Sequence, residues 1–203
     1  MMRIDAFAGE ICAYLKTFPE VKQCGLYGSL QKGNSDRYSD IDIELDVTGN
    51  DNGKFLLKLP ELLSKRYQLI FYDFAPSLAP EQYVVTVAID QENPFMLVDI
   101  SCTASKVCGT VSKEELRRQN NPFDHTLKLF TANLKHYIRG MDCLDDIFKM
   151  FHRIFPKTEV SSDEKRMLED IYFWLVRNGE KRHKTYLDAF QTYLDSGAFD
   201  IFR

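Results

Sequence analysis

One short stretch constrains the fold more than any other. From Ser39 to Val47 the sequence reads SDIDIELDV, in which apolar residues alternate with acidic ones. Strict alternation of this kind is typical of a β-strand with one buried and one solvated face. Because side chains two residues apart point to the same face of a strand, Asp40 and Asp42 are expected side by side on the solvated face.

The rest of the first half is expected to mix helices with strands. Two helices are predicted from apolar periodicity, at residues 4–18 and 55–67, the second with Pro60 as a kink or break. Strands are predicted at residues 21–27, 39–47, 68–74, 82–89 and 95–101. A turn at residues 90–94 is expected to join the last two as a hairpin.

From Ser112 onward the pattern becomes helical. Ser112 with Glu115, and Ser161 with Glu164, form capping-box patterns. Apolar residues recur at helical spacing within residues 123–138, 144–154, 168–175 and 187–194. The sequence therefore predicts an α+β fold, with a mixed-sheet α/β domain over residues 1–112 followed by a helical bundle over residues 113–203.

Overall charge argues against a polynucleotide as the first choice of substrate. The net charge is −4 at pH 7 and the isoelectric point is about 5.6, so the chain as a whole does not attract phosphate backbones. No apolar run approaches the ~20 residues of a membrane span, and the N-terminus carries acids unlike a signal peptide. We expect a cytoplasmic protein whose five cysteines are reduced and buried.

Two sequence features suggest chemistry. Asp40 and Asp42 on one strand face can coordinate a divalent cation, because hard cations such as Mg²⁺ take oxygen ligands. Asp99 supplies a third carboxylate, because it is the single acid in the apolar stretch FMLVDI, where an unpaired charge is costly to bury. Gly28 and Ser29 form a turn where backbone and hydroxyl groups can approach a phosphate. We expect the three carboxyl groups to converge.

Other interpretations of these residues are simpler. The acids can be the polar face of an ordinary strand, and Gly28-Ser29 an ordinary turn. The basic run KRHK at residues 181–184 can contact a nucleotide or an acceptor, but a solvated helix face is the better interpretation. Trp174 with its aromatic neighbours can line a pocket, although aromatic residues at this density are mostly core.

The pattern of Gly-Ser, a spacer, Asp-x-Asp between apolar residues and a later strand Asp resembles the DNA polymerase beta-like nucleotidyltransferase superfamily. Within it, the stretch GSLQKGNSDRYSDIDI is most similar to the small bacterial branch of aminoglycoside and lincosamide nucleotidyltransferases. The resemblance covers about the first half of the chain. It implies a mixed sheet packed on helices, two catalytic Mg²⁺ ions, and attack by an acceptor hydroxyl on the α-phosphorus of a nucleoside triphosphate with release of pyrophosphate.

The resemblance also assigns roles to residues. Asp40 and Asp42 would ligate both metals, Asp99 would ligate the metal that activates the acceptor, and Gly28 with Ser29 would hold the distal phosphates. Antibiotic-modifying relatives usually carry Ala-Arg where this chain has Gln31-Lys32. Lys32 or Arg37 is expected to replace that positive charge at the nucleotide.

The expected reaction is therefore transfer of a nucleoside monophosphate, AMP from ATP, to a hydroxyl of a small-molecule acceptor, with antibiotics as first candidates. Two alternatives stay open. One is a non-catalytic nucleotide-binding or antitoxin-like regulatory module, against which the intact carboxylate set argues. The other is a nucleotidyltransferase that acts on RNA, against which the acidity and the short helical half argue.

Overall fold

The computed structural model describes residues 4–75, 79, 81–89, 93–104, 110–157 and 163–195. The chain divides into two compact units. The first comprises Met1–Asp90 and Met96–Asn121, and the second comprises Gln91–Phe95 and Pro122–Arg203. The first unit contains the sheet, and the second consists mainly of helices.

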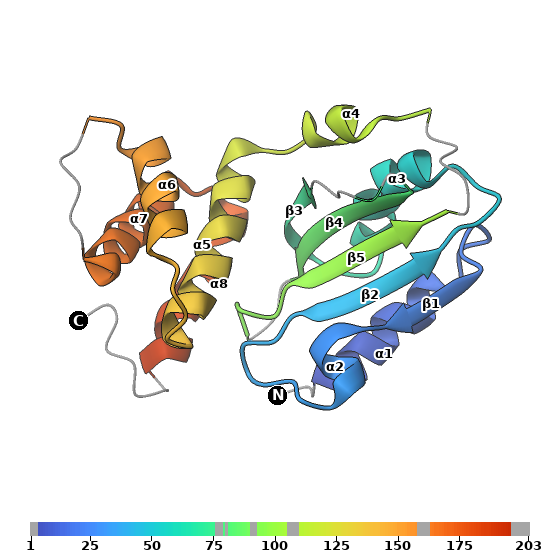
Figure 1. The fold of residues 1–203 in the computed structure, drawn as a ribbon, viewed down its shortest axis with the longest axis horizontal. Coiled ribbons are helices and arrows are strands. Elements are labelled where there is room, and N and C mark those ends of the chain that lie inside the picture. The colour runs from blue at the N-terminus through green and yellow to red at the C-terminus, as the bar shows by residue number, and fades with distance from the viewer. Residues whose placement is uncertain are drawn as a thin grey trace. The chain divides into compact units, whose positions relative to one another are not determined.

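A five-stranded mixed sheet forms the centre of the first unit (Figure 1). In spatial order its strands are β1 (Gln23–Leu26), β2 (Ile41–Asp46), β5 (Val98–Thr103), β4 (Gln82–Ile89) and β3 (Leu69–Ala75). Strands β2 and β5 are parallel, and the other neighbouring pairs are antiparallel. The predicted α+β fold class is confirmed.

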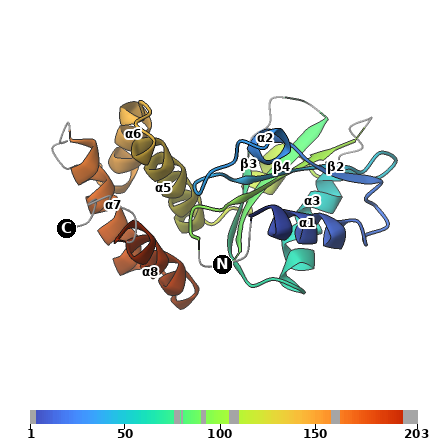
Figure 2. The same ribbon diagram turned by 90° about the horizontal axis from the view of Figure 1, so that it is seen from below.

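Two helices, α1 (Ile4–Leu15) and α3 (Asn52–Ser64), cover one face of this sheet (Figure 2). The alternation in β2 turns Ile41, Ile43 and Leu45 into the core beneath them, where all three are fully buried. The acids of β2 consequently face the other side of the sheet, where the short helix α2 (Gly28–Lys32) lies (Figure 2).

Pro60 is expected to kink or to break the second helix, and the break is wrong. Helix α3 contains Pro60 and continues to Ser64. A proline inside a helix removes one backbone hydrogen bond. The burial of Leu56, Leu59 and Leu63, on both sides of the proline, holds the helical path despite this loss.

Strand β5 begins later than the predicted start at Phe95. That residue belongs to the second unit, where its ring meets the ring of Phe190 with 5.1 Å between centroids. Its carbonyl oxygen also accepts a hydrogen bond from Lys135 Nζ at 3.4 Å. Contacts distant in sequence therefore set the strand boundary. Residues 90–92 of the expected hairpin turn lie outside the described part of the chain.

The helical second half is confirmed. Helix α4 (Lys113–Arg117) belongs to the first unit, and the second unit holds α5 (Pro122–Ile138), α6 (Leu144–Ile154), α7 (Glu164–Asn178) and α8 (Lys181–Asp195). The apolar positions at helical spacing form its interior, as Phe130, Leu134 and Ile171 show by complete burial. Among the helices that the structure describes, none is long and apolar enough to cross a membrane.

One of the two predicted capping boxes is present. The Ser112 hydroxyl accepts from the Glu115 amide, and the Glu115 carboxylate accepts from the Ser112 amide. The second prediction is wrong, because Asp163 caps α7 by accepting from the amides of Lys165 and Arg166. Asp163 stands directly before the helix and can reach two of its free amides. Ser161 lies outside the described residues.

The basic run at residues 181–184 is only partly solvated. Lys181 and Lys184 are exposed, but His183 is buried. The guanidinium of Arg182 donates from Nη2 to both carboxylate oxygens of Asp124, at 3.1 and 3.2 Å. The interpretation as a solvated face is therefore wrong for Arg182 and His183, which tie α8 to α5.

Candidate functional site

Two carboxylates lie side by side on the face of the sheet opposite α1 and α3. Asp42 of β2 and Asp99 of β5 are paired in register on adjacent parallel strands. Strands in a sheet are about 4.8 Å apart, and paired residues point to the same face. Both side chains are half-buried. The structure therefore brings together two of the acids singled out in the sequence.

The same row of residues continues across the sheet. Asp99 pairs with Thr86 of β4, and Thr86 pairs with Asp73 of β3. Thr86 and Asp73 are both buried, with exposed fractions of 5% and 1%. Four consecutive strands thus present Asp42, Asp99, Thr86 and Asp73 in one line on one face.

Thr86 is a site neighbour that the sequence analysis missed. Its hydroxyl donates a hydrogen bond of 2.5 Å to Asp99 Oδ1. A hydrogen bond to a charged acceptor is among the stronger polar contacts in proteins. A signal was present, since Thr86 interrupts the apolar stretch YVVTVAI as Asp99 interrupts FMLVDI.

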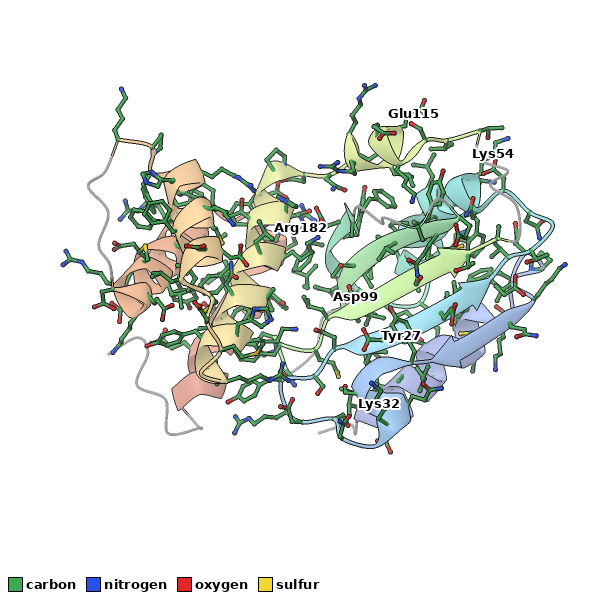
Figure 3. The ribbon with its side chains drawn as sticks, in the orientation of Figure 1. Tyr27, Lys32, Lys54, Asp99, Glu115 and Arg182 are labelled. Carbon is green, nitrogen blue, oxygen red and sulfur yellow. The ribbon has the colours of Figure 1, made fainter. Side chains whose placement is uncertain are left out.

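Tyr27 follows β1 and extends its pairing with β2, because the Tyr27 amide donates to the Asp42 carbonyl at 3.0 Å. Burial, followed by the negative charges of Asp42, Asp99 and Glu44, raises the pKa of Tyr27 to about 12. The phenol therefore lies within electrostatic reach of all three carboxylates. Figure 3 labels Tyr27 between β1 and α2, Asp99 of β5 and Lys32 of α2.

Helix α2 begins at Gly28, which lies against the carboxylate of Asp42. Gly28 has φ +68°, a left-handed conformation that favours glycine. A Cβ atom at Gly28 would overlap the carboxylate of Asp42. The missing side chain thus leaves the space that the Asp42 carboxylate occupies. Ser29, the next residue, is half-buried.

Asp40 lies immediately before β2 and is half-buried. A compact turn precedes it, in which Asp36 accepts hydrogen bonds from the Tyr38 amide and the Ser39 hydroxyl. Within the described ranges, no three His, Cys, Asp or Glu side chains lie close enough together to hold a metal ion. Convergence of Asp40 with the other two carboxylates stays a prediction.

The two expected phosphate-binding cations lie near this turn and on α2. Lys32 is the last residue of α2 and is exposed. Arg37 is also exposed, with its guanidinium 5.3 Å from the centroid of the Tyr38 ring. Their contact with a nucleotide stays a prediction.

A cavity of about 570 Å³ opens beside Tyr27 along β1 and β2. Its polar lining includes Glu44, Asp46 and Gln31. Glu44 lies two positions after Asp42, on the same face of β2. The cavity therefore begins next to the carboxylate pair. Hydrogen bonds from Thr48 lower the pKa of Asp46, which keeps its carboxylate charged.

No family model matches the sequence, and no curated protein matches it. Three solved structures to which the chain is similar have TM-scores of 0.36 to 0.38. The GLD-2/RNP-8 complex shares 14% identity, over 98% of this chain and 71% of that chain. The polymerase core of TRAMP, an RNA surveillance complex, shares 11% identity, over 97% of this chain and 58% of that chain. The non-canonical poly(A) polymerase complex GLD-2–GLD-3 shares 14% identity, over 98% of this chain and 62% of that chain.

Proposed function

We propose that this chain is a metal-dependent nucleotidyltransferase that transfers a nucleoside monophosphate, AMP from ATP, to an acceptor hydroxyl. The observation that carries the proposal is the in-register pair Asp42 and Asp99 beside the Gly28-Ser29 turn. Two adjacent carboxylates on one face suit a hard divalent cation, and the open space at Gly28 lets the carboxylate of Asp42 sit against the turn.

Asp42 and Asp99 would hold Mg²⁺, and Asp40 is proposed as a third ligand whose carboxylate would turn toward the pair when the ion binds. When bound, two such ions stabilise the attacking and leaving oxygens of an in-line displacement. The acceptor hydroxyl loses its proton to solvent, its oxygen bonds to the α-phosphorus, and the bond from that phosphorus to the oxygen of pyrophosphate breaks. Gly28 and Ser29 would contact the distal phosphates, and Lys32 or Arg37 would balance their charge.

The acceptor is proposed to be a small hydroxyl-bearing molecule, with antibiotics of the aminoglycoside or lincosamide type as the first panel. The cavity beside Tyr27 supports this choice, because its carboxylates Glu44 and Asp46 would repel the phosphates of a polynucleotide. Its volume of about 570 Å³ is within the usual range for small-molecule sites.

The test is incubation of the full chain with α-³²P-labelled nucleoside triphosphates, Mg²⁺ and a panel of acceptors that includes single-stranded RNA. We expect labelled small-molecule product that requires Mg²⁺ and disappears in Asp42→Asn. Nucleotide binding should also weaken in Ser29→Ala. Labelled RNA would assign the acceptor to the nucleic-acid class, whereas Mg²⁺-dependent nucleotide binding without any product would favour the non-catalytic module.

A further inference from the structure

The hydrogen bond between Thr86 and Asp99 joins two neighbouring interior strands of the sheet. Strand β4 is paired on both sides, with β3 and with β5, so the backbone of Thr86 is held by neighbours in both directions. The side chain is 5% exposed and donates to Asp99 Oδ1 at 2.5 Å. A buried hydroxyl on a fixed strand can hold a carboxylate in one orientation.

We propose that Thr86 is a positioning residue for the metal site, fixing the carboxylate of Asp99 beside that of Asp42. This inference rests on the proposed function, since it assumes that the pair binds a divalent cation. A carboxylate on a strand rotates readily about its terminal torsion, and a metal needs its oxygen donors aimed at one point. Residues that orient metal ligands typically change metal affinity 10- to 100-fold when they are removed.

The experiment titrates the whole 203-residue chain with Mn²⁺ alone, and electron paramagnetic resonance measures the free ion. Thr86→Val keeps the shape of the side chain but removes its donor, and Thr86→Ser keeps the hydroxyl. Thr131→Val is the matched control, because Thr131 is likewise buried and its hydroxyl donates to the Leu127 carbonyl within the second unit. Thermal unfolding without metal is measured for every variant.

We expect Thr86→Val to weaken Mn²⁺ binding by about tenfold or more, Thr86→Ser to recover most of the affinity, and Thr131→Val to bind as the wild type does. If Thr86 had only a structural role, Thr86→Val would lower the unfolding temperature, but the Mn²⁺ affinity would not fall in Thr86→Val and recover in Thr86→Ser. If Thr86→Val does not fold, Thr86→Ala is titrated in its place, and the same loss is expected.

Two outcomes overturn the inference in distinguishable ways. If the wild type binds Mn²⁺ and Asp42→Asn does not, while the folded Thr86 variant without a hydroxyl binds normally, the role of Thr86 is wrong and the metal site stands. If neither the wild type nor any variant binds Mn²⁺, the proposed metal site fails, and the role of Thr86 in it fails with it.

Discussion

Gly28 lies so close to Asp42 that a Cβ atom at position 28 would overlap the carboxylate oxygen Oδ2. The same glycine has φ +68°, so two independent reasons favour glycine there. The turn and the strand acid are thus fitted to each other, which a pattern of Gly-Ser and Asp-x-Asp in the sequence does not by itself require. The relationship makes Gly28 a sensitive probe of the site.

Gly28→Ala should abolish Mn²⁺ binding and nucleotidyl transfer, because the new methyl group must displace the Asp42 carboxylate. Gly33→Ala is the matched control, since Gly33 has φ +69° but nothing within 4 Å of its added Cβ. Both variants should lose about 1–2 kcal/mol of stability through the left-handed backbone. Equal retention of Mn²⁺ binding in the two variants would show that the close approach at Gly28 has no bearing on the site.

Asp42→Asn should separate function from stability. The substitution removes a proposed metal ligand and is expected to eliminate turnover. It also removes one of two adjacent like charges, so the unfolding temperature in EDTA should stay the same or rise. The measurements are thermal unfolding and the labelled-nucleotide assay. Wild-type turnover, or a variant that is unfolded at room temperature, would contradict the assignment.

Local sequence patterns predicted where helices and strands occur, but not which strands lie next to each other in the sheet. The alternation in residues 39–47 reports burial of one strand face, and β2 follows it residue by residue. The pairing of Asp42 with Asp99 depends on the strand order, which places β5 parallel to and next to β2. Neither strand's own sequence indicates which strand will be its neighbour. The start of β5 could not be predicted either, because Phe95 packs in the second unit through its contacts with Lys135 and Phe190.

The polar contacts were the least predictable. A run of basic residues gives no indication of which of them finds a partner, and Arg182 finds Asp124 at a separation of 58 positions. Thr86 was discoverable as a lone polar residue in an apolar strand, but its partner Asp99 was not. Side-chain geometry between distant strands depends on the tertiary structure, and periodicity carries no information about it.

Asp124 should stabilise the second unit through its hydrogen bonds with Arg182 and His183. The Glu180 amide donates to His183 Nδ1, so His183 carries its hydrogen on Nε2 and donates it to Asp124 Oδ1 at 3.0 Å. Arg182 donates to both oxygens of the same carboxylate.

Asp124→Ala should therefore cost about 2 kcal/mol, below the ~3–5 kcal/mol for a fully buried pair, because the Arg182 side chain is partly exposed. Urea unfolding followed by circular dichroism measures the change. Lys184→Ala, at an exposed position of the same helix, serves as the control and should stay near the wild-type value. Equal stability of the two variants would show that the Asp124 network contributes nothing.

Asp51 should make stability depend on pH at the start of α3. Its Oδ1 accepts from the Lys54 amide at 2.9 Å, and its Oδ2 accepts from the amide and hydroxyl of Thr110 at 2.9 and 2.7 Å. Burial by itself would raise the pKa of Asp51, but these hydrogen bonds outweigh it and lower the pKa below the ordinary 3.8.

Because the folded-state pKa of Asp51 is lower than the unfolded one, its contribution is complete above the unfolded pKa and is lost as the pH falls through the folded value. Asp51→Ala should cost about 1 kcal/mol at pH 7, typical for an N-cap. The gap between wild type and variant should narrow below about pH 4. Asp51→Asn should keep most of the cap without that pH dependence. Denaturant unfolding at pH 7, 5 and 3 measures all three proteins, and a gap that is constant over this range would show that the Asp51 carboxylate charge does not stabilise the cap.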